Sequence, residues 1–375
     1  MEQAITIEDL RLIARRRSPK AAFDYVDGAA EDEISLGRAR SAFRNVEFRP
    51  TVLNDVSGID LRAEIAGGTS NLPFGIAPTG FTRMMHAAGE QAGYAAAVEH
   101  GIPFALSTLA TTSIEDIALA APNGRRWFQL YVGEDRQLTR QLVERAKTNG
   151  YDTLLVTVDC SVSSTRRRDV RNGMTLPPAI TLKTVLDASY RPAWWFDFLT
   201  TPPPAFASLE GTNTDMEAVL VDLFDPALSY ADLDWLRSIW DGKLFVKGIQ
   251  TAEDAGRAAR HGIDGIVISN HGGRQLDRAA TPLHELPAVR ETVGTSIEII
   301  YDTGILNGGD IVAALAAGAD FVLVGRAWLY GLMAGGKIGV DRAIDILAGE
   351  VRRAMQLLGV SKVSDLRPEH VILHR

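Results

Sequence analysis

The 375-residue sequence contains one cysteine, no run of 18 apolar residues and no excess of positive charge. A single cysteine excludes an intrachain disulfide framework and a cysteine-based zinc site. Without a long apolar run no segment is predicted to span a membrane, and the first twenty residues lack the apolar core of a secretory signal. A net charge of −8 offers no electrostatic footprint for nucleic acid. We therefore expect a cytoplasmic α/β protein of enzyme size.

Two nucleotide-binding motifs are also missing, because neither G-x-G-x-x-G nor G-x-x-x-x-G-K-[ST] occurs in the chain. Their absence disfavours the dinucleotide-binding and P-loop folds that those motifs identify. What the sequence does contain is 46% hydrophobic and 23% charged residues, the balance of a soluble globular protein with a substantial core.

Short apolar runs rich in β-branched residues alternate along the chain with amphipathic helical stretches. The predicted strands lie at 72–78, 102–107, 126–132, 153–159, 243–248, 265–270, 297–302 and 321–326. Predicted helices include 90–100, 136–148, 252–261 and 310–317, and Thr251 is predicted to cap the third of these. Eight βα units predict a TIM (β/α)8 barrel. A doubly wound sheet, which needs a switch point and usually has fewer strands, is the alternative.

Two segments depart from an ideal barrel, although residues 1–375 are interpreted as one domain. Residues 1–70 are predicted to form an N-terminal helical extension, with the barrel at 71–360. The connection at 160–229, after the fourth strand, is far longer than an ordinary βα loop and is typical of a lid or binding segment. It contains the stretch RPAWWFDFLTTPPPAF, whose Trp194, Trp195, Phe196 and Phe198 could contact a membrane interface. Alternatively, the loop packs on its own barrel or on a neighbouring subunit.

Polar residues follow every predicted strand, which is where a TIM barrel places its active site. Any one of them could simply cap the next helix, but the full set predicts a binding site. Two stretches after the last strands, DTGILNGGD and VGRAW, are typical of a phosphate site, with Arg326 able to pair with the phosphate. A phosphorylated ligand or cofactor is therefore expected.

The stretch SNHGGRQLD, together with FQLYV, TVD, KGI and a C-terminal GR, resembles the FMN-dependent L-2-hydroxy acid oxidases and dehydrogenases. Within that family, APTGFTRMMHAAGE, STLATTSIEDIA and DLDWLRSIWDG are most similar to the bacterial L-lactate dehydrogenases. The resemblance implies FMN as cofactor and oxidation of an L-2-hydroxy acid, with lactate expected, to the 2-oxo acid. It also implies a quinone or another electron acceptor and a homotetramer. No metal site is expected.

The resemblance assigns catalytic and substrate-binding roles to specific residues. His271 is implied to be the base, Asp159 to stabilise its imidazolium, and Arg274 and Arg166 to clamp the substrate carboxylate. Arg168 remains an alternative to Arg166, because the stretch TRRRD offers three arginines. Further implied roles are hydrogen bonding to substrate by Tyr25 and Tyr131, with Tyr131 also catalytic, and stabilisation of the reduced flavin by Lys247. The residues implied to hold FMN are Pro78, Thr79, Gly80, Ser107, Gln129, Thr157, Lys247, Ser269, Asp302, Gly304, Gly325 and Arg326.

Some positions depart from the family pattern. Leu306 and Asn307 stand where many relatives carry an arginine pair near the FMN phosphate, so weaker FMN binding is expected. Leu109, where many plant-type oxidases have tryptophan, disfavours a glycolate-type pocket, and Gly80 favours a dehydrogenase over an oxidase.

Several functional alternatives stay open. An oxidase of the same family would use O2 and release H2O2, and a larger acid such as mandelate could replace lactate. A barrel isomerase or lyase and a non-catalytic flavin-binding protein are further alternatives. The aromatic loop at 190–206 also allows peripheral contact with the inner face of the membrane.

Overall fold

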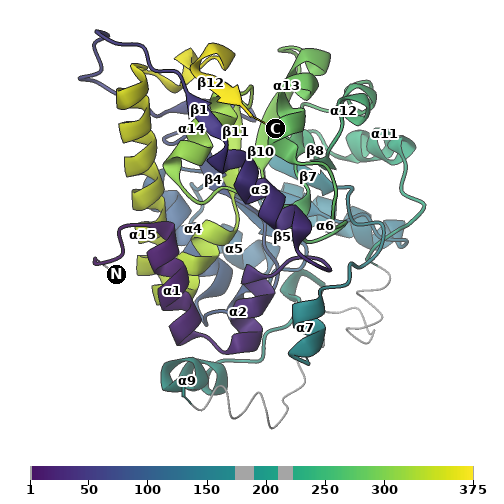
Figure 1. Cartoon of the computed structure of the whole chain (residues 1–375). Helices are drawn as coiled ribbons and strands as arrows, with labels where there is room; N and C mark the ends of the chain where they lie inside the picture. The colour runs from purple at the N-terminus through teal and green to yellow at the C-terminus, as the bar shows by residue number, and fades with distance from the viewer. Residues whose placement is uncertain (1, 174–189, 210–222, 375) are drawn as a thin grey trace.

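The eight predicted strands close into one parallel barrel (Figure 1). The structure is a computed structural model that describes residues 2–173, 190–209 and 223–374. In barrel order from the first, the strands are β4 (Phe74–Ile76), β5 (Phe104–Ser107), β6 (Arg126–Leu130), β7 (Thr153–Thr157), β8 (Lys243–Ile249), β9 (Gly265–Ile268), β10 (Glu298–Asp302) and β11 (Phe321–Val324). The barrel closes where β11 pairs with β4, with Val322 opposite Phe74 and Val324 opposite Ile76. The TIM barrel prediction is confirmed, and the doubly wound sheet is excluded.

The strands read as apolar runs because both of their faces are covered. Every residue of β5, β6, β7, β9 and β11 is buried. The covering helices are α4 (Gly89–His100), α5 (Ile114–Ala120), α6 (Arg136–Thr148), α11 (Tyr230–Ile239), α12 (Ala252–Ala258), α13 (Pro282–Val293), α14 (Gly308–Ala316) and α15 (Arg326–Leu358). Thr251 caps α12 as predicted, because its side chain accepts a hydrogen bond from the Asp254 amide.

The N-terminal segment is helical only up to Arg44. It forms α1 (Ile7–Arg17), α2 (Lys20–Asp27) and α3 (Ile34–Arg44), and α1 packs against α15. The prediction of helix as far as residue 70 was wrong. After α3 the chain forms the short strands β1 (Val46–Phe48), β2 (Ala63–Ile65) and β3 (Gly68–Ser70), and β1 pairs with β12 (Val371–Leu373). Pro50 and the glycines at 58, 67 and 68 interrupt any helix across this stretch.

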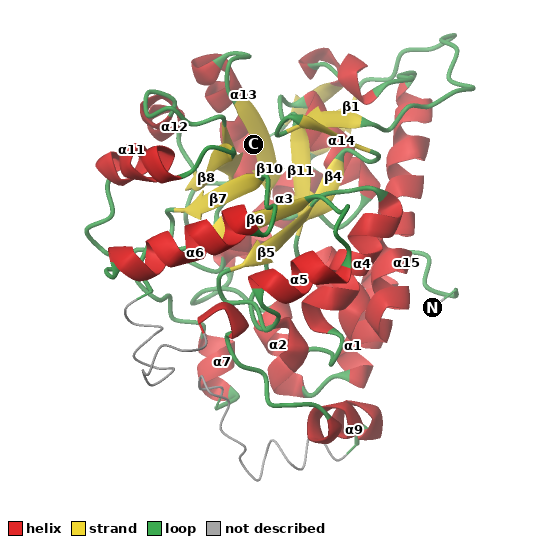
Figure 2. Ribbon diagram, turned by 180° about the vertical axis from the view of Figure 1, so that it is seen from behind, coloured by secondary structure: helices red, strands yellow, loops and turns green. Residues whose placement is uncertain are grey.

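The two ends of the barrel are covered differently. The β1–β12 pair lies at one end, whereas α1, α2, α7 (Arg167–Arg171) and α9 (Pro192–Thr200) gather at the other (Figures 1 and 2). That second end is the C-terminal end of the strands, since Tyr25 of α2 and Arg166 line one cavity with residues that follow the strands. Within the described ranges, no helix combines the length and apolarity needed to cross a bilayer.

The long connection after β7 is partly described. Residues 174–189 and 210–222 lie outside the described residues, and so does the side chain of Phe198. In α9, the Trp194 indole donates a hydrogen bond to the Met84 carbonyl at 3.1 Å, while Phe196 and Leu199 are exposed. One side of α9 therefore contacts the barrel and another faces solvent.

Candidate active site

A single cavity at the C-terminal end of the barrel receives residues from the ends of all eight strands. All of the predicted site residues except Asp159 and Ser269 line it. They are Tyr25, Pro78, Thr79, Gly80, Ser107, Gln129, Tyr131, Thr157, Arg166, Lys247, His271, Arg274, Asp302, Gly304, Gly325 and Arg326. Parallel strands that end at one rim bring together residues as far apart in the chain as Pro78 and Arg326.

The backbone of the SNHGG stretch explains how His271 reaches this cavity. His271, Gly272 and Gly273 have φ values of 58°, 65° and 75°, a left-handed conformation that is uncommon for a residue with a side chain. A Cβ atom added to Gly272 would lie 2.7 Å from an Arg326 nitrogen, so glycine is needed there. The Asn270 side chain accepts a hydrogen bond from the Gly273 amide at 2.9 Å and so holds the turn.

Asp159 lies behind the imidazole of His271. Its Oδ1 is 3.2 Å from His271 Nδ1, so Nε2 is the ring nitrogen left for the cavity. Although burial opposes ionisation, the charges of His271 and Lys247 lower the pKa of Asp159 below its ordinary value. Asp159 therefore stays anionic and fixes the orientation of the ring. Its second oxygen, Oδ2, is buried and has no hydrogen-bond partner among the described residues.

Two arginines flank the ring of Tyr25. The guanidinium carbons of Arg274 and Arg166 lie 4.7 Å and 5.2 Å from the centre of the ring. Arg274 donates to the carbonyls of Tyr25 and Gly28. No carboxylate of the described residues lies at ion-pair distance from it. Burial and the neighbouring charge of Arg166 lower the pKa of Arg274 to about 10. This part of the cavity therefore holds a positive charge that the protein does not balance.

The positions of Arg166 and Arg168 decide which of the two arginines can contact a ligand in the cavity. Arg166 lines the cavity and makes a 2.7 Å ion pair with Asp169. Arg168 is absent from the cavity wall and pairs instead with Asp27 at 3.0 Å and with Glu33 at 2.5 Å. Only Arg166 is positioned to meet a ligand in the cavity.

Tyr131 is a buried phenol on the cavity wall. Burial, reinforced by the nearby Cys160 and Asp159, raises the pKa of Tyr131 well above its ordinary value. The phenol therefore remains protonated at any pH at which the protein works and can donate a hydrogen bond.

Lys247 is a buried cation whose charge the protein does balance. Its Nζ lies 3.0 Å from Asp302 Oδ2 and donates to Ser269 Oγ at 3.1 Å. Burial would lower the pKa of Lys247, but the charges of Asp302 and Asp159 prevail and raise it. Ser269 accepts this bond from behind the cavity wall and also accepts from the His271 amide at 2.9 Å. Its hydroxyl donates in turn to Asp302 Oδ2 at 2.9 Å, so Ser269 lies outside the cavity lining, and its implied role in holding FMN stays a prediction.

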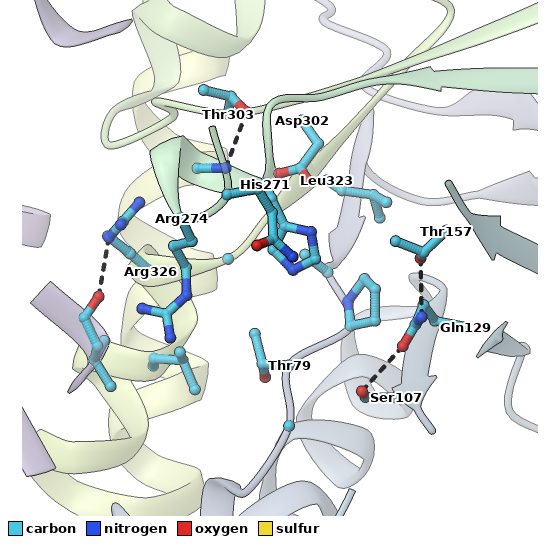
Figure 3. A pocket seen from close by; sticks show the side chains of 18 of the residues that line it. Thr79, Ser107, Gln129, Thr157, His271, Arg274, Asp302, Thr303, Leu323 and Arg326 are labelled. Atoms are coloured by element: carbon cyan, nitrogen blue, oxygen red, sulfur yellow. Dashed lines mark hydrogen bonds between the residues drawn. The ribbon is translucent and has the colours of Figure 1, made fainter. Parts of the chain in front are cut away.

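A chain of hydrogen bonds crosses another part of the wall (Figure 3). Ser107 Oγ donates to Gln129 Oε1 at 3.0 Å, and Gln129 Nε2 donates to Thr157 Oγ1 at 2.9 Å. Thr79, also shown there, has a buried hydroxyl without a partner among the described residues. A ligand in the cavity could satisfy this hydroxyl, since buried polar groups are nearly always hydrogen-bonded.

Gly80 has a steric explanation. A Cβ atom at this position would lie 2.9 Å from the Leu109 Cβ atom and 3.0 Å from the Leu109 carbonyl oxygen. An alanine would require Leu109 to move. Glycine here is therefore needed for packing, and it is weaker evidence for a dehydrogenase than the sequence indicated.

Several polar residues at the site were not predicted from the sequence, among them Cys160 and Arg40. Cys160 Sγ lies 3.4 Å from Asp159 Oδ1 and 3.6 Å from His271 Nδ1, and its place directly after Asp159 was an available signal. Arg40 of α3 lines the cavity beside Gly304, 264 positions away in the chain. No local pattern marked Arg40.

Comparison with known proteins identifies the family. Residues 14–373 match the family model for FMN-dependent dehydrogenase. Over 368 residues the chain is 58% identical to a Mycobacterium tuberculosis protein provisionally named L-lactate dehydrogenase, covering 98% of this chain and 89% of that one. It is 40% identical over 371 residues to an Acinetobacter baumannii L-lactate dehydrogenase, covering 97% of this chain and 96% of the relative.

A solved structure agrees with these relatives. The crystal structure of the monotopic membrane protein (S)-mandelate dehydrogenase has a TM-score of 0.94 and 38% sequence identity, covering 99% of this chain and 100% of that chain. The match includes the barrel and both flanking segments, so the likeness is not limited to the common barrel fold. The chain belongs to the FMN-dependent dehydrogenase family.

Proposed function

We propose that the protein oxidises an L-2-hydroxy acid, L-lactate, to the 2-oxo acid with bound FMN. The observation that carries this proposal is the unbalanced positive charge of Arg274 next to the Asp159–His271 pair. A 2-hydroxy acid has a carboxylate for the arginines and, one carbon away, an alcohol for the histidine. The two L-lactate dehydrogenases among the relatives support lactate.

The residues present fit FMN, the cofactor of this family. Thr79 offers a buried hydroxyl that has no partner among the described residues, and Lys247 offers a fixed cation on the same cavity wall. The Ser107–Gln129–Thr157 chain adds amide and hydroxyl groups of the kind that recognise the polar edge of a flavin. When bound, FMN accepts the two electrons that leave the substrate.

His271 is proposed to take the proton released at the substrate during oxidation. Nε2 faces the cavity, while Asp159 holds Nδ1 and favours the positive charge that the ring gains. Arg274 and Arg166 bind the carboxylate and thereby orient the carbinol carbon. Tyr25 and Tyr131 are proposed to hydrogen-bond the substrate from the cavity wall. Removing two electrons and two protons from the alcohol gives the 2-oxo acid.

The decisive test is anaerobic reduction of the purified holoenzyme by a panel of L-2-hydroxy acids, followed by flavin absorbance at roughly 450 nm. We expect L-lactate to bleach the flavin faster than mandelate, with D-lactate inactive. Absence of bleaching by every acid in the panel would reject the proposed activity. Faster bleaching by mandelate would reject lactate and retain the reaction.

The His271→Gln variant tests the base assignment. We expect it to bind FMN and substrate but to be reduced roughly 10²- to 10⁴-fold more slowly. His261→Gln is the matched control, because His261 pairs with Asp234 on the outside of the barrel and should leave the rate unchanged. Near-normal reduction of His271→Gln would rule out this histidine as the base.

A quinone is proposed as the electron acceptor, and the surface around α9 supports it. Phe196, Leu199 and Tyr190 are exposed there. Tyr190 borders a groove with Arg15 and Arg16 of α1. Apolar side chains next to arginines suit the interface of an anionic membrane, where quinones dissolve, and the (S)-mandelate dehydrogenase neighbour is described as monotopic. We propose that this surface rests on the inner face of the membrane.

Sedimentation with anionic vesicles tests the membrane contact. The double variant Phe196→Ser/Leu199→Ser should no longer sediment with the vesicles. Its flavin should still be reduced by substrate, because neither residue lines the cavity. Unchanged sedimentation of this variant would argue against contact through α9.

Admitting air to the reduced enzyme distinguishes the two acceptors. Persistent bleaching until a quinone is added is expected. Rapid recolouring with H2O2 would establish the oxidase alternative instead.

We also propose that residues 1–375 act as one functional unit, to whose cavity the described part of the connection after β7 contributes. Arg166 from this connection lines the cavity together with Tyr25 from the N-terminal segment, which supports the interpretation. A homotetramer remains a prediction from the family resemblance, and light scattering of the purified protein would test it.

A further inference from the structure

At one end of the cavity, side chains of the protein already engage several backbone amides that could otherwise bind a phosphate group. This end is formed by Gly304 and Leu306 after β10, Gly325 after β11, and Leu36 and Arg40 of α3. α14 begins there, and the first amides of a helix commonly bind phosphate. In this chain side chains of the protein engage four amides at or just before this helix start, those of Leu306, Asn307, Gly308 and Asp310.

Three side chains accept four backbone hydrogen bonds at the start of α14. Asp310 Oδ2 accepts from the amides of Leu306 at 2.9 Å and Asn307 at 3.2 Å. Glu350 Oε2 accepts from the Gly308 amide at 2.7 Å. The Asn307 side chain accepts from the Asp310 amide at 2.8 Å. Because these four donors are engaged, a phosphate at this end gains from a cationic side chain.

Arg326 offers only part of its guanidinium. Nε donates to the Val26 carbonyl at 3.0 Å and Nη2 to the Gly28 carbonyl at 2.8 Å. Figure 3 shows it on the same side of the cavity as Arg274, which also donates to Gly28. Leu306, close to the start of α14, has no charge. The remaining arginine on the wall at this end is Arg40.

Arg40 is directed to this end by its helix and its contacts. Leu36 and Arg40 are four residues apart on α3 and share the face that lines the cavity. One amino group of Arg40, Nη1, donates to the Gly304 carbonyl and pairs with Asp310 Oδ2 at 2.6 Å. No partner within the described residues engages its Nε and Nη2. Burial raises the pKa of the Asp310 carboxyl, and the charge of Arg40 opposes that shift.

We propose that Arg40 supplies the cation that binds the FMN phosphate in this chain, in the place that Leu306 leaves uncharged. Its free Nη2 and Nε can donate to phosphate oxygens while Nη1 stays on Gly304 and Asp310. This inference depends on FMN being the cofactor and does not depend on which acid is oxidised.

Flavin binding provides a test that does not involve turnover. FMN and riboflavin, which lacks the phosphate, are titrated into protein stripped of flavin, and binding is followed by quenching of flavin fluorescence. We expect Arg40→Gln to weaken FMN binding roughly ten- to a hundredfold, as the loss of a charge-assisted hydrogen bond predicts. Riboflavin binding should change little. Adding Leu306→Arg to Arg40→Gln should restore most of the FMN affinity.

The matched control is Arg44→Gln, one turn further along α3. Arg44 is exposed and donates to Ser41, so neither flavin should bind differently. A merely structural role for Arg40, holding Asp310 and Gly304, would weaken FMN and riboflavin equally, and that result would overturn the proposal. Unchanged FMN binding in Arg40→Gln would overturn it as well.

Arg40→Lys serves if the glutamine variant does not fold. Lysine keeps the ion pair with Asp310 but lacks the additional donors of the guanidinium. A loss of affinity confined to FMN supports the proposal, whereas equal losses for the two flavins, or none, refute it. A failed proposal would leave FMN-dependent substrate oxidation intact, so the outcomes of the two proposals remain distinguishable.

Discussion

Lys247 and Arg274 are both buried cations on the wall of one cavity, yet the protein treats their charges in opposite ways. Lys247 has Asp302 at 3.0 Å and Asp159 nearby, and its pKa is raised. Arg274 has carbonyl partners, a neighbouring arginine and no paired carboxylate among the described residues, and its pKa is lowered to about 10. Burying an unpaired charge is costly. The difference indicates that the charge of Lys247 is balanced within the folded protein, whereas the charge of Arg274 is available to an anionic ligand.

Lys247→Met should have the largest effect on stability. It would leave the partly buried Asp302 without its cation, and breaking a fully buried pair costs about 3–5 kcal/mol, which sets the upper end of the expected loss. We expect a lower free energy of unfolding and loss of FMN, measured by urea unfolding and by flavin content. The double variant Lys247→Met/Asp302→Asn should lose less stability than Lys247→Met alone. A stable Lys247→Met would show that the pair is not what balances this charge.

Arg274→Met should affect substrate binding instead of stability. Removing a cation that lacks a protein anion is expected to leave the free energy of unfolding unchanged or higher. The carboxylate of the substrate loses its main partner, so KM should rise roughly thirtyfold or more. Flavin content should stay normal. If Arg274→Met unfolds as easily as Lys247→Met, the contrast between the two cations is wrong.

Asp302→Asn would remove the carboxylate paired with Lys247, so that Lys247, like Arg274, would lack a paired carboxylate. Asp159 and Ser269 remain near the ammonium group, so we expect a moderate loss of about 1–3 kcal/mol. In the native protein the raised pKa of Lys247 stabilises the fold below the ordinary lysine value, and this stabilisation is lost as pH rises through the raised pKa. The variant should lose it at lower pH, which thermal unfolding between pH 8 and 11 (roughly the lysine range) can detect. Identical pH profiles would contradict the assignment.

The smallest effect is expected from pH alone. Arg274 must be protonated to bind a carboxylate, so substrate affinity should be constant below its pKa of about 10 and fall as the pH rises above it. Arg274→Lys should move this break to lower pH, because lysine has a lower ordinary pKa than arginine and burial lowers it further. Steady-state KM at increasing pH provides the measurement. A native profile that stays flat well above pH 10 would mean that the arginine keeps its charge despite burial.

Much of the fold was predictable because its signals are local. Eight apolar runs and the helices between them predicted the barrel, and Thr251 marked its own helix start. The extension was predicted less well. Residues 46–70 were expected to be helical but include β1, whose partner is β12 at the far end of the chain. A three-residue strand that is stabilised by so distant a partner shows no periodic pattern in its own sequence, and so it could not be predicted.

For the candidate site too, some features were predictable from the sequence and others were set only by the tertiary structure. The chain by itself determined which residues end the strands, and parallel strands in a barrel bring such residues to one rim. It thereby identified His271, Arg274 and Lys247, whose functional roles are still to be measured. The three-dimensional structure decided what each of them faces: Ser269 turns behind the wall, Arg168 turns to Asp27, and Arg40 reaches Gly304 across 264 positions. Charge balance depends on distances between groups remote in sequence, and only folding sets those distances.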